Sequence, residues 1–253
     1  FQYLTHGHEQ VGGRWGNARL TERMRPQSVQ TYYNTLKTFF RWMIEEGAAS
    51  SNPMERIPTP IARVDQVNPF SAEEIRRIQE ACKTTRYAAR DRAIIDMFLD
   101  TGARESELLF IEIGDVDMTE CKVMVTGKGN KRRQLYFGRH TKASLWRYLR
   151  GEIRQGNDDR LFRGEKGDLT RSGLYRIIKR LEDVAHVSPM HPHRFRHTFA
   201  VTFLRSGGNV YALKDLLGHT DFKMTQRYVA LAQSDMAAQH RKHSPVEFMR
   251  KSK

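Results

Sequence analysis

The sequence predicts a mainly helical protein with one small β-hairpin, arranged as two domains. Apolar residues recur at three- and four-residue steps through most of the chain, which is typical of amphipathic helices. Residues 122–137 instead alternate apolar and polar side chains around a glycine-containing turn, as a hairpin does. Prolines punctuate residues 51–68, where no hydrophobic period survives, so we expect a linker there.

The composition is that of a globular chain. Its 253 residues include 39% hydrophobic and 28% charged side chains, enough to bury one or two cores. No apolar run reaches membrane-spanning length and no signal peptide is recognisable, so we expect a cytoplasmic protein. Cys82 and Cys121 form no CxxC pair, so we expect two buried thiols and neither a zinc knuckle nor a disulfide framework.

The chain carries a formal net charge of +14 at pH 7. Residues 1–68 hold 8 Lys and Arg against 6 Asp and Glu, and residues 69–253 hold 35 against 23. Such an excess favours a polyanionic partner, above all nucleic acid. On charge alone, a basic surface that is merely solvated stays open as the alternative.

The first clear helix begins at Ser28 and ends at Gly47. Its apolar residues recur at helical spacing and predict one buried face, formed by Val29, Tyr33, Leu36, Phe40, Met43 and Ile44. Lys37 and Arg41 lie four residues apart on one side of this helix. Helix geometry alone makes them two exposed cations.

Two helices and a polar turn follow the linker. A capping box at residues 71–74 opens one helix, and a second helix is expected at 87–100. The next helix begins with Arg104 in its first turn. A cation gains nothing from the helix dipole at that end, so Arg104 needs an anion nearby. Glu107, three residues on, is the local candidate for a structural ion pair.

The predicted hairpin turns at Gly127-Lys128-Gly129-Asn130. A lysine at such a tip is usually a solvated cation, and no Walker motif surrounds Lys128 to indicate ATP binding. Two amphipathic helices follow, at 141–153 and 170–185. The second has a basic side of the kind that can lie in a DNA major groove, formed by Arg171, Arg176, Lys179 and Arg180.

The segment from His191 to Tyr228 concentrates residue types that serve phosphoryl transfer. His193 and Arg196 lie three residues apart and share one face of a predicted helix. A guanidinium matches two phosphate oxygens, and an imidazole can move a proton near neutral pH. His219 and Tyr228, nine residues apart, add a donor and a candidate nucleophile.

A zinc site is the alternative for this segment, because His193 and His197 lie four residues apart. A catalytic zinc typically needs three protein ligands, and the His-Glu-x-x-His motif is absent, so we expect no metal. His197 is then expected to be buried or to form a hydrogen bond beside Arg196.

Taken together and in order, these motifs resemble the tyrosine recombinase (phage integrase) family. The resemblance rests on Thr101-Gly102-Ala103-Arg104-Glu105-Ser106-Glu107-Leu108, Gly127 to Arg133, His193-x-x-Arg196-His197, Leu217-Gly218-His219 and Tyr228. It covers nearly the whole chain. It implies a helical core-binding domain at residues 1–60, truncated here, a linker at 61–69, and an α+β DNA breaking-rejoining catalytic domain at 70–253 with a C-terminal exchange tail.

The resemblance also implies site-specific strand cleavage and rejoining through a 3′-phosphotyrosine, without ATP, cofactor or metal. The implied catalytic roles are Tyr228 as nucleophile, Lys128 as general acid, His193 in proton transfer, and Arg104, Arg196 and His219 as phosphate ligands. Glu107 and His197 support the site. The implied DNA contacts are Lys37, Arg41, Lys131, Arg132, Arg171, Arg176, Lys179 and Arg180.

The implied partners are double-stranded attachment or recombination sites, further copies of the chain in a tetramer on DNA, and a directionality or architectural protein. The protein would then be associated with the nucleoid. A type IB topoisomerase would share the chemistry but act as a monomer without choosing a site. A catalytically silent DNA-binding protein would leave the matched catalytic residues unexplained. A mobile-element integrase is favoured over a resolvase, and the DNA target stays open.

Overall fold

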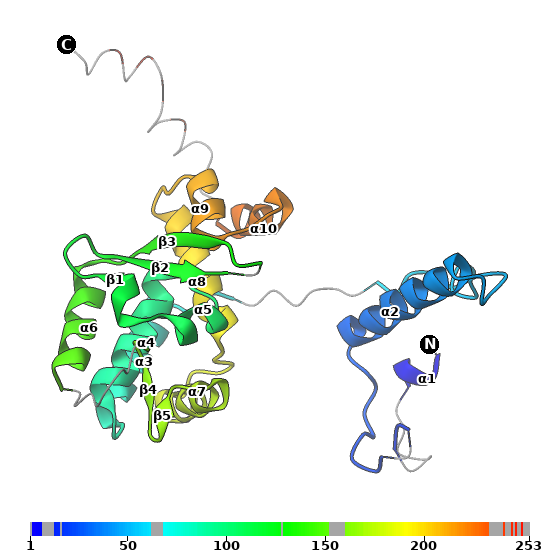
Figure 1. The fold of residues 1–253 in the computed structure, drawn as a ribbon, viewed down its shortest axis with the longest axis horizontal. Coiled ribbons are helices and arrows are strands. Elements are labelled where there is room, and N and C mark those ends of the chain that lie inside the picture. The colour runs from blue at the N-terminus through cyan, green and yellow to red at the C-terminus, as the bar shows by residue number, and fades with distance from the viewer. Residues whose placement is uncertain are drawn as a thin grey trace. The chain divides into compact units, whose positions relative to one another are not determined.

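The structure is a computed structural model that describes residues 2–6, 13–15, 17–61, 68–127, 129–151 and 160–232, with single residues at 240, 244, 246 and 249. The chain divides into two compact units, Phe1–Gln66 and Val67–Lys253. The prediction of a mainly helical chain with small sheets is confirmed (Figure 1). Most of the predicted exchange tail lies outside the described residues, as does the predicted end of the helix at 141–153.

The first unit contains the short helix α1 (Gln2–Thr5) and the long helix α2 (Pro26–Glu45). Proline suits the first turn of a helix, because an amide there has no partner within the helix. Gly47, just past the end of α2, has a φ of 73°, a left-handed conformation that glycine adopts without strain. The predicted helix is therefore confirmed, with its start two residues earlier.

The predicted apolar face of α2 is only half correct. Val29 and Tyr33 are buried, and the Tyr33 hydroxyl donates to the Ile57 carbonyl at 2.9 Å. Leu36 and Ile44 remain 38% and 39% exposed, and Phe40 and Met43 are half-buried. Periodicity identified the helix but could not establish how much of its face is covered.

The second unit holds the remaining helices. In chain order they are α3 (Ala72–Ala81), α4 (Ala88–Thr101), α5 (Glu105–Phe110), α6 (Arg139–Gly151), α7 (Arg171–Ala185), α8 (Pro192–Arg205), α9 (Val210–Leu217) and α10 (Phe222–Ala232). Short 3₁₀ turns follow α3 and α5, at Cys82–Thr84 and Ile113–Asp115.

Side-chain caps fix the starts of these helices. The Ser71 hydroxyl accepts from the Glu74 amide at 3.1 Å, and Glu74 Oε2 accepts from the Ser71 amide at 2.7 Å, so the predicted capping box is confirmed. Thr170 caps α7 through the Gly173 amide, and Asn209 caps α9.

The predicted hairpin is present as β2 (Lys122–Thr126) paired antiparallel with β3 (Arg132–Tyr136). A two-residue strand, β1 (Val116–Asp117), extends it to a three-stranded sheet of order β1-β2-β3. A separate ribbon pairs β4 (Arg163–Gly164) with β5 (Gly167–Asp168). Strands this short leave no alternation to read, which is why the sequence did not indicate them.

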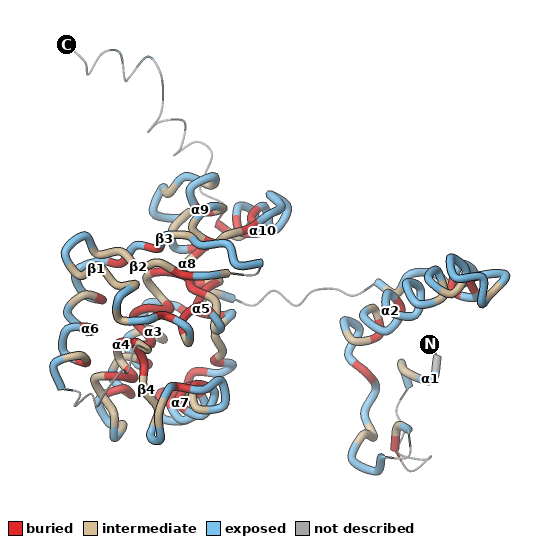
Figure 2. The backbone as a smooth tube through the Cα atoms, viewed as in Figure 1, coloured by how far each residue is buried: buried red, intermediate tan, exposed pale blue. Residues whose placement is uncertain are grey.

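The core of the second unit forms around α4, which packs against both α6 and α8 (Figure 2). Phe195 of α8 lies between two other rings, 4.8 Å from Phe70 and 5.8 Å from Phe98 by centroid. The second half of α8 belongs to a smaller buried cluster formed with α9 and α10, which contains Ala200, Val201, Leu213, Leu217 and Tyr228. Helix α8 therefore joins both cores, and side chains on it are held firmly.

The two cysteines are free thiols. Cys82 is buried as predicted. Cys121 is only half-buried, which corrects the expectation, because it lies in the turn before β2 with a φ of 52°.

Candidate active site

The turn between α4 and α5 positions Arg104. Gly102 ends α4 with a φ of 62°, and a Cβ there would lie 2.4 Å from the Phe199 ring. Only glycine therefore fits this turn. Arg104 occupies the residue just before α5, one position ahead of the predicted first turn. Its Nη2 donates to the Gly218 carbonyl at 3.0 Å, which ties the turn to the end of α9.

Arg196 approaches the same region from α8. Its side chain is buried, with Nη1 donating to the Gly102 carbonyl at 2.7 Å and Nη2 to the Leu217 carbonyl at 2.6 Å. Burial and the neighbouring Arg104 charge lower the pKa of Arg196 to about 10, which leaves it charged at neutral pH. Two guanidinium groups from distant parts of the sequence thus meet beside the segment 217–218.

Glu107 lies beneath these arginines and is 2% exposed. Its Oε2 accepts from the Arg104 amide at 2.7 Å and its Oε1 from Arg104 Nη1 at 2.8 Å, so the predicted ion pair is present. Burial alone would raise the pKa of Glu107. Hydrogen bonds from Arg133 and from the Arg104 backbone outweigh burial and lower that pKa, so the carboxylate is ionised.

Arg133 on β3 is the residue of this cluster that the sequence analysis missed. Its Nη1 and Nη2 donate to the two Glu107 oxygens at 2.6 and 2.9 Å, and its Nε donates to the Leu216 carbonyl at 2.8 Å. The hairpin alternation contained a usable signal. Arg133 pairs across the sheet with buried Val125 and shares the inward face with Leu135, so it is a charged residue on an apolar face.

His219 follows Gly218, whose φ of 62° ends α9. The imidazole is buried, with Nδ1 2.8 Å from the Thr225 hydroxyl and Nε2 3.1 Å from Arg196 Nη2. Burial, and then the charges of Arg196 and Arg104, lower the pKa of His219 to about 4. The ring is therefore neutral at physiological pH.

Tyr228 of α10 lies against two histidines and is 9% exposed. Its ring centroid is 6.2 Å from that of His219, nearly parallel at 11°, and 5.3 Å from that of His197. No hydrogen bond joins the Tyr228 hydroxyl to any residue that the structure describes. The half-buried His197 has an Nε2 with no partner among the described residues, and burial, followed by the Arg227 charge, lowers its pKa.

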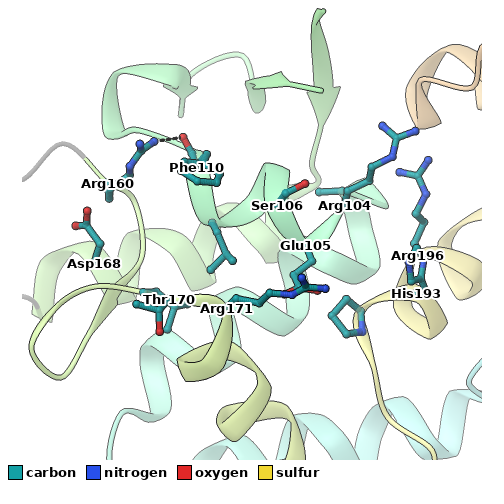
Figure 3. A pocket seen from close by; sticks show the side chains of 14 residues that line it. Arg104, Glu105, Ser106, Phe110, Arg160, Asp168, Thr170, Arg171, His193 and Arg196 are labelled. Atoms are coloured by element: carbon teal, nitrogen blue, oxygen red, sulfur yellow. Dashed lines mark hydrogen bonds and ion pairs between the residues drawn. The ribbon is translucent and has the colours of Figure 1, made fainter. Parts of the chain in front are cut away.

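An open cleft of about 570 Å³ leads to the two arginines (Figure 3). His193 is exposed and lines this cleft together with Arg104 and Arg196, so the predicted shared face of His193 and Arg196 is present. Arg171 also lines the cleft and pairs with Glu105 at 2.8 Å. The cleft thus leads from the exposed side chains of His193 and Arg171 to the buried cluster.

The structure describes all but one of the other predicted contact residues. Lys128 is outside the described residues, whereas Lys131 and Arg132 are exposed, with Arg132 3.4 Å from Asp115. On α7, Arg176 and Arg180 line a second hollow and Lys179 pairs with Glu182 at 3.2 Å. In the first unit, Lys37 lies over the Tyr33 ring and Arg41 lies 3.8 Å from Glu45.

No three His, Cys, Asp or Glu side chains in the part of the chain that the structure describes are grouped so that they could hold a metal ion. None of its helices combines the length and apolar character needed to cross a membrane.

The fold and cluster define a class of protein. A mainly helical unit that gathers two arginines, a histidine and a tyrosine has the groups needed to bind a phosphate and attack it.

Comparisons with known proteins identify the family. Residues 69–235 match the model of the phage integrase family. The tyrosine recombinase XerC of Alcanivorax borkumensis is 33% identical over 213 residues, 81% of this chain and 69% of its own. The crystal structure of XerA recombinase is 27% identical with a TM-score of 0.62, covering 88% of this chain and 84% of that one. The lambda integrase dimer bound to a COC′ core site shares the fold, with 18% identity and a TM-score of 0.65 over 80% and 59% of the two chains.

The chain therefore belongs to the phage integrase family. It is a site-specific tyrosine recombinase, an enzyme that cleaves and rejoins DNA. Neither the topoisomerase nor the silent DNA-binding alternative is favoured by these relatives.

Proposed function

We propose that Tyr228 attacks a phosphodiester of duplex DNA and forms a 3′-phosphotyrosine, leaving a free 5′ hydroxyl. One observation carries this assignment. Arg104 and Arg196 donate to adjacent carbonyls at 217–218, directly before His219, and the ring of Tyr228 lies along the ring of His219. Nucleophile and phosphate ligands thereby occupy one small region.

The two arginines stabilise the charge that develops during attack. Negative charge gathers on the nonbridging oxygens, and preorganised donors at that point are the strongest means of stabilising it. Arg104 and Arg196 keep their positions through bonds to backbone carbonyls, so they need little reorganisation when the phosphate arrives. His219 is the third phosphate ligand, and Glu107 and His197 support the site.

Proton transfer is assigned to Lys128 and His193. A phenol titrates near ~10, so Tyr228 must be activated by its surroundings. Lys128 protonates the departing 5′ oxygen as general acid, and exposed His193 in the cleft assists proton transfer. The phosphotyrosine keeps a phosphoester bond, so rejoining requires no ATP.

The same proposal assigns a function to each segment of the chain. Residues 1–60 form a core-binding domain that contacts DNA through Lys37 and Arg41, residues 61–69 link it, and residues 70–253 carry the catalysis. The basic side of α7 and the exposed cations at Lys131 and Arg132 add phosphate contacts.

The active assembly is a tetramer on DNA, and the protein is the integrase of a mobile element. The lambda integrase that shares this fold is a dimer on its core site. Residues 244–253 are the exchange tail, because their apolar side chains Val246 and Met249 are exposed. Sedimentation on two-site DNA tests this. Deleting 244–253 should weaken assembly and spare single-site binding, and unchanged assembly would refute the role.

The test of the function is capture of the covalent intermediate. A pool of synthetic duplexes with random sequence around a nick is mixed with the protein, separated on a denaturing gel and sequenced from the protein-bound band. The nick lets the short cleaved strand diffuse away, so the adduct accumulates. Adducts at a defined sequence are expected, and a protein that folds and binds the pool yet forms none would refute the proposal.

A further inference from the structure

Arg133 uses its whole guanidinium to join three parts of the second unit. Its three nitrogens hold both Glu107 oxygens and the Leu216 carbonyl at 2.6 to 2.9 Å. These partners come from α5 and from the end of α9, while Arg133 itself comes from β3. The side chain is 14% exposed, so it is set in the interior and does not lie open to a substrate.

The contacts of Arg133 limit how many hydrogen bonds the Glu107 carboxylate accepts from the Arg104 side chain. Because Arg133 pairs with both carboxylate oxygens, the Arg104 side chain contributes a single bond, from Nη1 at 2.8 Å. Arg104 Nη2 turns to the Gly218 carbonyl, and its Nε has no hydrogen-bond partner among the described residues. Part of the Arg104 guanidinium is therefore available to donate hydrogen bonds to an incoming anion.

The backbone next to His219 is packed directly on Arg133. A Cβ at Gly218 would lie 3.0 to 3.1 Å from Nη1, Cζ and Nε of Arg133. Contacts that close leave little freedom to the neighbouring backbone. Arg133 thus fixes the position from which His219 and the Gly218 carbonyl reach the site.

We propose that Arg133 is a positioning residue of the strand-transfer reaction. It neutralises the Glu107 carboxylate so that Arg104 stays available to the phosphate, and it holds the segment 216–219 in place. This inference rests on the proposed function of the same site. Without Arg133, the buried carboxylate would have Arg104 as its remaining charged partner, and that pair would compete with the phosphate.

The test compares single-turnover adduct formation on the duplex selected from the random-sequence pool. Arg133→Gln should slow adduct formation by about 10²-fold, the loss typical of catalytic groups displaced by roughly 1 Å. Arg133→Lys should stay slow, because one ammonium cannot reach both carboxylate oxygens and the Leu216 carbonyl. Arg139→Gln is the matched control, since it removes the same charge from an exposed residue of the same unit. It should change the rate less than threefold, a loss well below what displaced catalytic groups show.

A second substitution separates positioning from mere structural support. In the Arg133→Gln protein, Glu107→Gln should recover about tenfold in rate, because a neutral amide no longer sequesters Arg104. In the unsubstituted protein the same Glu107→Gln change should slow the reaction. A purely structural role for Arg133 predicts that the two losses simply accumulate.

The outcomes are distinguishable. Absence of an adduct with the unsubstituted protein would overturn the proposed function and this inference with it. A normal adduct rate for Arg133→Gln, or further slowing when Glu107→Gln is added, would overturn the inference alone. Melting temperatures are measured for every variant. Should Arg133→Gln melt below the assay temperature, Arg133→Lys decides, because it keeps a cation beside Glu107, and a rate within threefold of the unsubstituted protein would refute positioning.

Discussion

Nε2 of His219 accepts a hydrogen bond from Nη2 of Arg196 at 3.1 Å. Arginine has only donors, so this nitrogen carries no proton, and the proton of the neutral ring lies on Nδ1, which faces the Thr225 hydroxyl at 2.8 Å. In this state His219 cannot donate to a phosphate through Nε2. A phosphate oxygen that takes over the Arg196 hydrogen bond would release Nε2 to bind a proton.

The first prediction follows from the pKa of His219, lowered to about 4 from an ordinary value of 6.5. Below pH 6.5 the unfolded chain binds a proton at this residue while the folded protein does not. The contribution of neutral His219 to the free energy of unfolding is therefore fully present above pH 6.5. It falls as the pH drops toward 4, by up to about 3 kcal/mol. Urea unfolding at pH 7, 5.5 and 4.5 measures this loss of stability.

His219→Gln is the control for this pH dependence. The pKa values of His191 and His197 are lowered as well, so some acid sensitivity should persist in that variant. The difference between the two proteins isolates His219. An identical loss of stability in both would contradict the buried neutral imidazole.

The second prediction concerns the nucleophile. Tyr228→Phe should abolish the covalent adduct and leave DNA affinity within a few-fold, because only the hydroxyl oxygen is lost and the ring still packs against His219. Gel separation and an equilibrium binding titration measure the two effects. If adduct persists, the nucleophile lies elsewhere, and Tyr211 is the first rival because it is 67% exposed on the adjacent helix α9.

The third prediction is a steep salt dependence of DNA binding. The excess of cations lies on residues 69–253, and each neutralised phosphate adds roughly 0.9 to the slope of log affinity against log salt. Affinity for the selected duplex should therefore fall by orders of magnitude between low and moderate salt. A nearly flat response would show that the basic surface serves another purpose.

The fourth prediction isolates the general acid by changing the leaving group. Lys128→Ala should slow cleavage by about 10²- to 10⁴-fold, because the departing 5′ alkoxide then lacks a proton donor. A strand with sulfur at the bridging 5′ position expels a thiolate, which titrates near ~8.5 and leaves without a proton. Lys128→Ala should regain most of its rate on that strand.

The controls for this experiment are Arg104→Ala and Arg196→Ala, which sulfur should not rescue because their role is charge stabilisation. Rescue of Lys131→Ala instead would move the acid to the neighbouring lysine. If neither lysine variant is rescued, His193 is the next candidate, since it lies in the cleft beside both arginines.

The fifth prediction tests the turn that holds Arg104. An L-residue in a left-handed conformation costs about 1–2 kcal/mol, and overpacking a filled site adds about 1–3 kcal/mol. Gly102→Ala should incur both costs because its Cβ would meet the Phe199 ring at 2.4 Å. Gly129→Ala, with a φ of 75° and nothing within 4 Å, should incur only the first. Chemical denaturation of both compares them, and equal losses would argue against the close contact.

The sequence by itself determined the local structure of this protein. The capping box at Ser71 and Glu74, the hairpin at 122–137 and the helices between them depend on residues close together in the chain, whose spacing carries the signal. The shared face of His193 and Arg196 is of the same kind. Ordered motifs then sufficed to indicate the family.

Tertiary structure decided what each polar group does. Arg133 and Glu107 are 26 residues apart, and Arg104 lies 114 residues from Gly218, so no local period could reveal that their side chains share one network. Whether His219 donates or accepts depends on a guanidinium brought to it by another helix. The hydrogen bonds of long charged side chains depend on which elements pack together. Only the folded core, in which α8 belongs to both buried clusters, fixes that packing.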